Sequence, residues 1–83
     1  MQDAIRAILR EHGRLAVDVA SLADDADLYR AGMTSHATVN VMLALEESFG
    51  IEIPDTMMRK STFQSVAGIR TAIVTITSNA QSA

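Results

Sequence analysis

The sequence predicts a small all-α domain of four helices, three long and one short, with a long loop between the first helix and the second. Apolar residues recur at helical spacing in three segments, and a bundle is the architecture that buries all three apolar stripes together. The one strand-like alternation, over residues 15–19, has no second segment to pair with. A chain of 83 residues is long enough for one small core only, so we expect a single domain over residues 1–83.

The first helix is expected over residues 3–12. Ile5, Ile8 and Leu9 have the spacing of one helix face, and Gly13 follows them as a stop. Residues 14–34 lose this period and are expected to form a long loop that apolar side chains hold against the core. Long loops in small domains often carry function.

The second helix, expected over residues 35–49 and ended by Gly50, has the strongest pattern in the chain. Successive residues of a helix differ in direction by about 100°, which separates two opposite stripes. The stripe predicted to face the core consists of Thr38, Met42, Leu45 and Phe49, with Val41 beside it. The stripe predicted to face solvent consists of His36, Asn40, Leu43 and Glu47.

The rest of the chain is expected to form a link, a short helix and a last long helix. Pro54 disfavours a helical conformation at Ile53, so residues 51–55 are predicted to be extended, and a short helical piece is expected over residues 57–61. The last helix is expected over residues 65–77 from the apolar series Val66, Ile69, Ile73 and Ile76. The small and polar residues 78–83 are predicted to fray.

Composition excludes several classes of function. The chain has no cysteine, which rules out disulfides, thiolate zinc sites and a cysteine nucleophile, and an aromatic content of 4% leaves no stacking platform. A formal net charge of −3 with scattered basic residues disfavours nucleic acid and anionic membranes as partners. No apolar run approaches the roughly 20 residues that cross a bilayer, and the N-terminus is unlike a signal peptide. We therefore expect a cytoplasmic protein.

Three aspartates of the long loop, Asp24, Asp25 and Asp27, could suggest a calcium site. An EF-hand loop needs an oxygen ligand where Tyr29 stands, a glycine where Arg30 stands and a closing glutamate, and the chain supplies none of these. We expect the three side chains to be solvated loop carboxylates.

Ser35 is the first candidate for chemistry, because it stands where a glycine-containing loop meets the second helix. The start of a helix offers unpaired N–H groups and the positive end of the helix dipole, which favour a phosphate group by about 0.3–1 kcal/mol. Gly32 lets the chain turn sharply and leaves the hydroxyl accessible. On position alone, a plain N-cap role for Ser35, or for Thr34 before it, is the favoured interpretation.

The surrounding residues add a resemblance. Residues 27–35, with the sequence Asp-Leu-Tyr-Arg-Ala-Gly-Met-Thr-Ser, resemble the prosthetic-group attachment motif of the acyl carrier protein family. The likeness covers residues 24–73 and includes the second helix and the Phe-Gly-Ile-Glu-Ile-Pro segment that follows it. A lone Gly-x-x-Ser is a weak signal, but its place between an Asp-Leu pair and this helix makes the combination specific.

The resemblance implies a four-helix carrier that is not an enzyme. It implies 4′-phosphopantetheine, derived from coenzyme A and joined to Ser35 by a phosphopantetheinyl transferase. The arm would hold an acyl or aminoacyl group as a thioester, so a protein without cysteine would borrow its thiol. The implied partners are the transferase, a ligase that loads the arm, and a downstream acceptor that the sequence does not identify.

Two residues depart from the pattern of carriers of fatty acid synthesis. Thr34 stands where those carriers usually have aspartate, and His36 stands where they usually have leucine. The solvent-facing stripe of the second helix is also less acidic than theirs. The Gly-Met-Thr-Ser-His segment resembles free-standing carriers that receive an amino acid from a dedicated ligase related to aminoacyl-tRNA synthetases. The predicted docking surface consists of Met33, Thr34, His36, Asn40, Leu43 and Glu47, extended by loop residues near Leu28 and Tyr29.

Other interpretations stay open. The protein could carry fatty acyl or polyketide groups, or it could be an unmodified helical interaction module in which Ser35 is only a cap. A helix-turn-helix DNA binder is disfavoured by charge. A Ser35–His36 catalytic pair is disfavoured because consecutive side chains of a helix diverge by about 100°.

Overall fold

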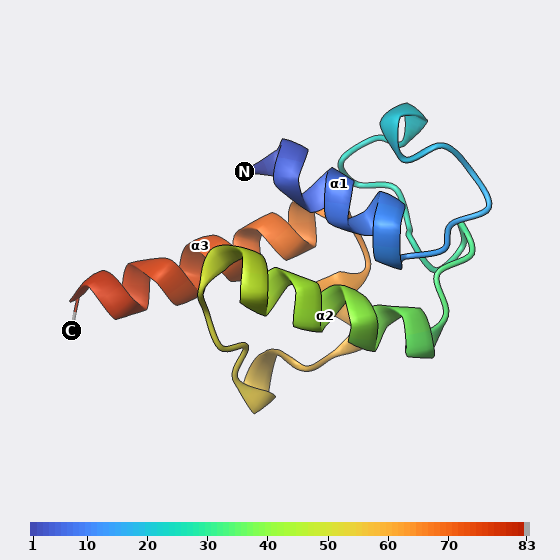
Figure 1. The fold of residues 1–83 in the computed structure, drawn as a ribbon. Coiled ribbons are helices and arrows are strands. Elements are labelled where there is room, and N and C mark those ends of the chain that lie inside the picture. The colour runs from blue at the N-terminus through green and yellow to red at the C-terminus, as the bar shows by residue number, and fades with distance from the viewer. Residues whose placement is uncertain (83) are drawn as a thin grey trace.

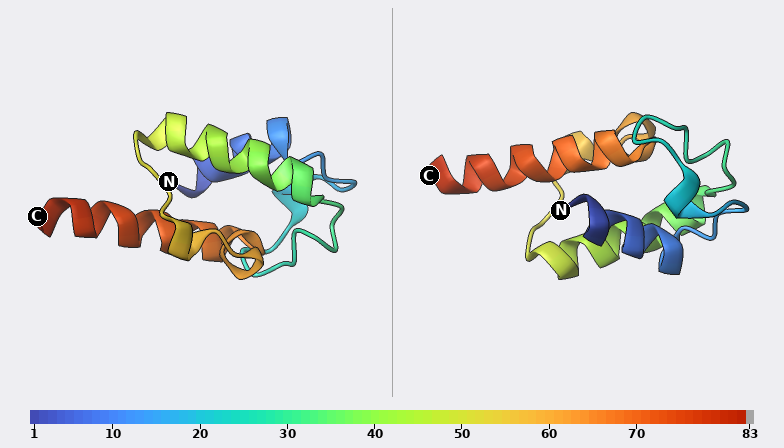
Figure 2. Two further views of the ribbon diagram at one scale, coloured as in Figure 1. Left: turned by 90° about the horizontal axis from the view of Figure 1, so that it is seen from below. Right: turned by 90° about the horizontal axis from the view of Figure 1, so that it is seen from above.

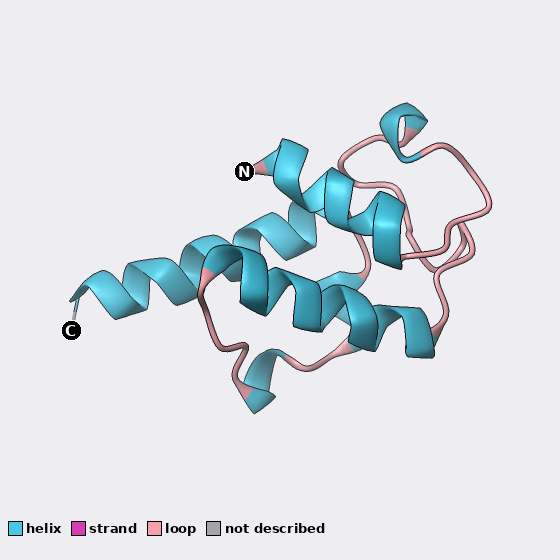
Figure 3. Ribbon diagram, viewed as in Figure 1, coloured by secondary structure: helices cyan, strands magenta, loops and turns pink. Residues whose placement is uncertain are grey.

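The computed structural model describes residues 1–82 of the chain, and the side chains of residues 1–78. Within this range it contains three α-helices, α1 (Gln2–His12), α2 (Ser35–Phe49) and α3 (Val66–Ser82). Three 3₁₀ turns lie in the connections, η1 (Val19–Ser21), η2 (Asp55–Met57) and η3 (Lys60–Phe63). The described residues form no strand (Figure 3), which confirms the all-α class. Across residues 1–82, the helices all lack the length and apolar character needed to cross a membrane.

The three helices form two layers (Figures 1 and 2). α1 and α2 lie side by side in one layer, α3 lies in the other, and the C-terminal turns of α3 extend past the rest of the molecule. α1 packs against both α2 and α3. Large side chains that are fully buried join the layers: Ile5, Leu9, Leu28, Val41, Leu45, Val66, Ile69 and Ile73. Removing each of these side chains from water contributes about 1.5–3 kcal/mol, so the apolar stripes hold the fold together.

The ends of the helices show where local signals decide the structure. α2 begins and ends where the sequence predicts, and Gly50 ends it in the left-handed conformation (φ 63°) with its N–H bonded to the oxygen of Glu46. α1 begins one residue earlier than expected. α3 continues to Ser82, five residues beyond its expected end at residue 77. The predicted fraying of residues 78–83 stays a prediction, and Ala83 lies outside the described residues.

The predicted fourth helix is not confirmed. Between α2 and α3 the chain forms the single turns η2 and η3, with Arg59 in an extended conformation (φ −128°, ψ 152°) between them. Turns of three or four residues are the usual length of this tighter helix. The segment crosses from the end of α2 to the start of α3 and buries one side chain of these turns, Phe63. It therefore lacks the apolar stripe that would stabilise a longer helix.

The core-facing stripe of α2 is rotated from the predicted one. The side chains that α2 buries are Ala37, Val41 and Leu45. Thr38, Met42 and Phe49 are only half-buried, so the prediction was right about Leu45 and wrong about the centre of the stripe. The stripe predicted to face solvent is confirmed as exposed: His36, Asn40, Leu43 and Glu47.

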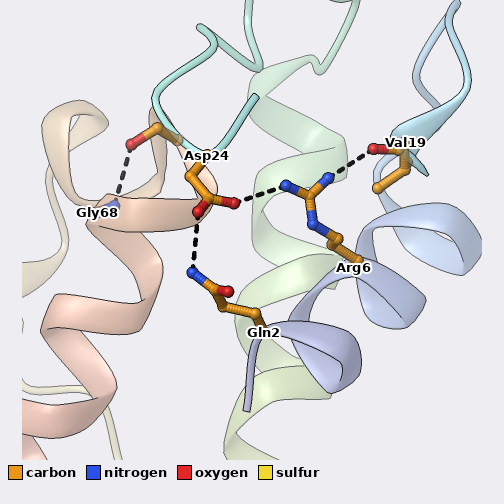
Figure 4. Close-up of polar contacts among 6 residues, drawn as sticks. Gln2, Arg6, Val19, Asp24 and Gly68 are labelled. Atoms are coloured by element: carbon orange, nitrogen blue, oxygen red, sulfur yellow. Dashed lines mark hydrogen bonds and ion pairs between the residues drawn. The ribbon is translucent and has the colours of Figure 1, made fainter. Parts of the chain in front are cut away.

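The long loop is tied to the helices by polar contacts that we call the Asp24 latch (Figure 4). The carboxylate of Asp24 accepts from Arg6 at 2.7 Å and from Gln2 at 3.1 Å, and Arg6 also donates to the carbonyl of Val19 at 2.7 Å. The carbonyl oxygen of Asp24 accepts from the N–H of Ala67 at 2.9 Å, which satisfies one of the free N–H groups at the start of α3. Asp24 is exposed, as predicted, and its carboxylate also makes hydrogen bonds that the sequence analysis did not predict.

Candidate functional site

The start of α2 is capped by Thr34. Thr34 has an extended backbone (φ −86°, ψ 167°), and its Oγ1 accepts from the N–H of Ala37 at 3.0 Å. This is the N-cap contact, which satisfies one of the free N–H groups of the first turn. The first turn of α2 contains no acidic residue, so its positive dipole end has no carboxylate of its own to neutralise it.

Ser35 is exposed, and its hydroxyl is not used for capping. It is the first residue of α2, and within the described part of the chain its side chain makes no hydrogen bond. The sequence left open whether Ser35 or Thr34 is the cap, and the structure gives that role to Thr34. The Ser35 hydroxyl is therefore free for covalent modification beside the positive end of a helix.

Gly32 shapes the loop before this serine. Its φ of 115° is a conformation that residues with a Cβ rarely adopt, and a Cβ there would lie 3.2 Å from the backbone N of Ala16. The neighbouring N–H of Ala16 donates to the oxygen of Ala31 at 2.9 Å, and the N–H of Met33 donates to the oxygen of Leu28 at 3.0 Å. The two ends of the long loop are thus tied together just before α2, which fixes the position of Ser35.

Asp27 anchors the same loop, a role that the sequence analysis missed. Its carboxylate accepts from the N–H of Tyr29 at 2.9 Å, from the N–H of Arg30 at 3.3 Å and from the side chain of Gln64 at 3.1 Å. Burial raises the pKa of Asp27, but these hydrogen bonds outweigh it, so the pKa lies below its ordinary value. An aspartate that bonds the backbone two residues on is a known turn former, which is the signal that could have found it.

A groove of about 520 Å³ lies beside the start of α2, between that helix and the segment that carries η3. Ser35 is among its lining residues, together with the apolar side chains of Met33, Met42 and Phe63. Its volume lies within the range of about 300–1,000 Å³ that small-ligand sites have. The sequence analysis did not predict the groove, because its two walls, within residues 29–42 and 58–63, are at least sixteen positions apart along the chain.

Arg59 and Lys60 also line the groove. The ammonium group of Lys60 lies 5.0 Å from the ring centroid of Tyr29, a cation–π contact. The hydroxyl of Tyr29 in turn accepts from Thr38 of α2 at 3.4 Å. Lys60 is thus positioned by a side chain that itself contacts the helix carrying Ser35.

The predicted docking residues divide into an exposed set and a buried set. Leu43 is 54% exposed, and Val39, which the prediction omitted, is 50% exposed one turn earlier on α2. Met33 is only 3% exposed and Leu28 is fully buried, so both belong to the core and we remove them from the docking surface. The exposed residues that remain are Thr34, His36, Asn40, Leu43 and Glu47.

Comparison with known proteins relates this site to a family. The family model for the phosphopantetheine attachment site matches residues 3–70. An aminoacyl carrier protein of Agrobacterium fabrum is 42% identical over 73 residues, which cover 88% of this chain and 88% of the relative.

Two solved structures extend the comparison. A carrier protein from Agrobacterium tumefaciens, bound to an engineered glycine:[carrier protein] ligase of Bradyrhizobium japonicum and AMP, superposes with a TM-score of 0.87. That match has 42% identity and covers 89% of this chain and 99% of the other. A glycylated carrier protein bound to the Bradyrhizobium japonicum ligase superposes with a TM-score of 0.74 at 28% identity, over 86% of this chain and 95% of the other.

Proposed function

This chain belongs to the phosphopantetheine-attachment family of carrier proteins, and we propose that Ser35 is the residue to which its 4′-phosphopantetheine is joined. One observation carries the proposal: Thr34 caps α2, so the exposed hydroxyl of Ser35 at the same helix start has no hydrogen bond within the described residues. A serine needed as a cap would lose that contact on esterification. Here the modification costs the helix nothing.

The residues around Ser35 fit a phosphodiester in charge and in access. The first turn of α2 carries no carboxylate that would repel a phosphate, and the helix dipole favours the negative charge. Gly32, on the approach to the serine, is exposed and has no side chain. A transferase can therefore reach the hydroxyl from the loop side.

When attached, the arm supplies a thiol that holds the cargo as a thioester. The chain itself holds the attachment serine in place through the hydrogen-bonded loop, and it presents the exposed stripe of α2 to partner enzymes. We propose that it has no catalytic activity of its own, since the chemistry belongs to the prosthetic group and to the partners. Because loading requires coenzyme A, we also propose that it works in the cytoplasm.

The cargo that we propose is an amino acid, with glycine as the first candidate. The support comes from the aminoacyl carrier protein of Agrobacterium fabrum and from the carriers that superpose on this chain in complexes with a glycine:[carrier protein] ligase. The partners are then a phosphopantetheinyl transferase and an aminoacyl ligase. We propose that the ligase docks on Thr34 and on the exposed stripe of α2, which consists of His36, Asn40, Leu43 and Glu47.

The modification is tested by mass spectrometry after incubation with coenzyme A and a promiscuous phosphopantetheinyl transferase. The wild-type protein is expected to gain roughly 340 Da, the mass of one phosphopantetheine. Ser35→Ala is expected to gain nothing. Ser48→Ala, which removes an exposed hydroxyl near the other end of α2, serves as the control and is expected to be modified fully. A wild-type protein that stays unmodified, or a modified Ser35→Ala variant, would contradict the proposal.

Docking is tested with the modified protein and a glycine:[carrier protein] ligase. Leu43→Glu is expected to raise the KM for the carrier at least about tenfold, because a carboxylate replaces an exposed apolar anchor. Val74→Glu, at an exposed apolar residue of α3, is the matched control and is expected to load normally. Loss of folding in Leu43→Glu, visible by circular dichroism, would show that the assignment of helix faces is wrong. Efficient loading with a fatty acid by an acyl ligase, and none with any amino acid, would favour the fatty acyl alternative.

A further inference from the structure

The groove beside Ser35 differs in charge from the rest of the molecule. The chain has a formal net charge of −3, but the charged side chains lining the groove, within the described part of the chain, are Arg59 and Lys60, and both are cationic. Neither of them forms an ion pair with a carboxylate of the described residues. Arg6 and Arg30, by contrast, are paired with Asp24 and Asp27. The groove therefore has two cations that the chain itself does not neutralise.

The groove is also continuous with the proposed attachment point. Ser35 and Lys60 line the same cavity, and the ammonium group of Lys60 lies over the ring of Tyr29. The floor between them is apolar, from Met33, Met42 and Phe63. A group esterified to Ser35 through a phosphodiester would start beside this cavity, with its negative charge near two unneutralised cations.

We propose that Arg59 and Lys60 hold the phosphodiester of the arm on Ser35, and that the same two cations exclude an ammonium group from the groove. This inference rests on the proposed modification of Ser35. The group proposed to occupy the groove is the protein's own prosthetic arm, whose phosphodiester carries one negative charge that complements Arg59 and Lys60. An amino acid on the arm carries an ammonium group, which like charges repel. The aminoacyl end is therefore kept outside the groove, where a partner can reach it, whereas an uncharged acyl group of similar size is free to enter.

The first test compares amide chemical shifts of the protein before and after modification. In the wild type, attachment of the arm is expected to shift the amides of Thr38, Val39 and Phe63, which line the groove, as well as that of Ser35. In the double variant Arg59→Gln, Lys60→Gln the shifts of the three groove amides are expected to fall about twofold or more. Arg10→Gln, Arg14→Gln removes two exposed cations of the α1 end and is the charge-matched control. The single variant Lys60→Arg, which keeps the charge and leaves Arg59 unchanged, is expected to show the same amide shifts on modification as the wild type.

The second test varies the cargo. Non-hydrolysable amide analogues of glycyl- and acetyl-coenzyme A are transferred to Ser35 of the wild type and of the double variant. The acetyl group is expected to shift the amide of Phe63 further than the glycyl group does in the wild type. The difference is expected to disappear in the double variant and at about 1 M salt, where the charges are screened.

The outcomes separate this inference from the proposed function. A protein that gains no mass at Ser35 fails the proposed function itself. A protein that is modified but shows no shift in the groove, or equal shifts for glycyl and acetyl cargo, overturns the inference and leaves Ser35 as the attachment residue. If the spectrum of the unmodified double variant departs from that of the wild type, Lys60→Gln alone replaces it in both tests.

Discussion

The middle of the long loop and its C-terminal end use their polar groups in opposite ways. At the Asp24 latch, the carboxylate, the guanidinium of Arg6 and the amide of Gln2 are bonded to one another (Figure 4). At the C-terminal end of the loop, the hydroxyl of Ser35 has no hydrogen bond in the described part of the chain, and Arg59, which lines the same groove, has no carboxylate partner there. The contacts of Asp24 hold the middle of the loop in place, whereas Ser35 and Arg59 stay without such contacts.

The contrast explains why a small domain has so long a connection. The loop brings Leu28 into the core and bonds its N–H to the oxygen of Gln64 at 2.7 Å, next to α3. With its middle anchored to α1 and α3, the loop can present an exposed serine at its C-terminal end without loss of order. Variants of the residues that anchor the loop should therefore change stability, whereas variants of Ser35 and Leu43 should change modification or loading with little effect on stability.

The largest expected effect compares two leucines. Leu28→Ala is expected to cost about 2–5 kcal/mol of unfolding free energy, because a fully buried side chain leaves a cavity between the loop and the helices. Leu43→Ala, at a side chain that is 54% exposed, is expected to cost at most about 0.5 kcal/mol. Urea unfolding followed by circular dichroism measures both. Equal losses for the two variants would show that the loop is not anchored as described.

The next effect compares two glycines that both have positive φ. Gly32→Ala is expected to cost about 1–3 kcal/mol, since a φ of 115° strains any residue with a Cβ and the added atom meets the N of Ala16. Gly50→Ala is expected to cost about 1 kcal/mol, because its φ of 63° is the ordinary left-handed conformation and no atom lies within 4 Å of the added Cβ. Thermal unfolding would rank the two, and a greater loss at Gly50 would contradict the close approach at Gly32.

A smaller effect separates the cap from the proposed attachment residue. Thr34→Ala is expected to cost about 1 kcal/mol, because it removes the bond to the N–H of Ala37. Ser35→Ala is expected to change stability by less than about 0.5 kcal/mol and to abolish modification. Unfolding of the unmodified variants and mass spectrometry together test the pair. If Ser35→Ala lowered the free energy of unfolding and Thr34→Ala did not, Ser35 and not Thr34 would be the cap of α2.

The elements that the sequence predicted well are those with local signals. α2 has a cap, a helical period and a glycine stop within residues 34–50, and its bounds were predicted correctly. The exposed stripe of the same helix was also predicted, because four residues at helical spacing share one face whatever packs behind them. The resemblance of residues 27–35 to an attachment motif identified Ser35 as the candidate attachment residue from the sequence alone.

The features that the sequence did not predict depend on partners far away in the chain. The Asp24 latch joins residues 18 and 22 positions apart, and the groove joins Ser35 to Lys60. The spacing of loop carboxylates in the sequence does not reveal which distant groups they contact, so Asp24 and Asp27 were interpreted only as solvated side chains. Met33 was assigned to the predicted docking surface, whereas tertiary packing buries it. The short helix expected after Pro54 is not confirmed, since its local pattern was weak and 3₁₀ turns form there instead.

The smallest expected effect is the dependence of stability on pH at the latch. The hydrogen bond from Arg6 holds the pKa of Asp24 below the ordinary value of 3.8, against a smaller opposing effect of burial and with further help from Gln2. The unfolded chain therefore binds a proton on this carboxyl at a higher pH than the folded chain does. The stabilisation is fully present above the ordinary pKa and is lost as the pH falls through the lowered pKa.

Urea unfolding from about pH 6 down to about pH 3 is expected to show a smaller loss of unfolding free energy for Asp24→Asn than for the wild type. The dependence of unfolding free energy on pH does not vanish in Asp24→Asn, because the pKa of Asp27 is lowered as well. Asp25→Asn, next to the latch and without a side-chain hydrogen bond among the described residues, is the control and is expected to keep the wild-type slope. An Asp24→Asn slope equal to that of the wild type would mean that Arg6 and Asp24 do not hold the loop in solution. The contrast between the middle of the loop and its C-terminal end would then rest on Leu28 and Asp27 alone.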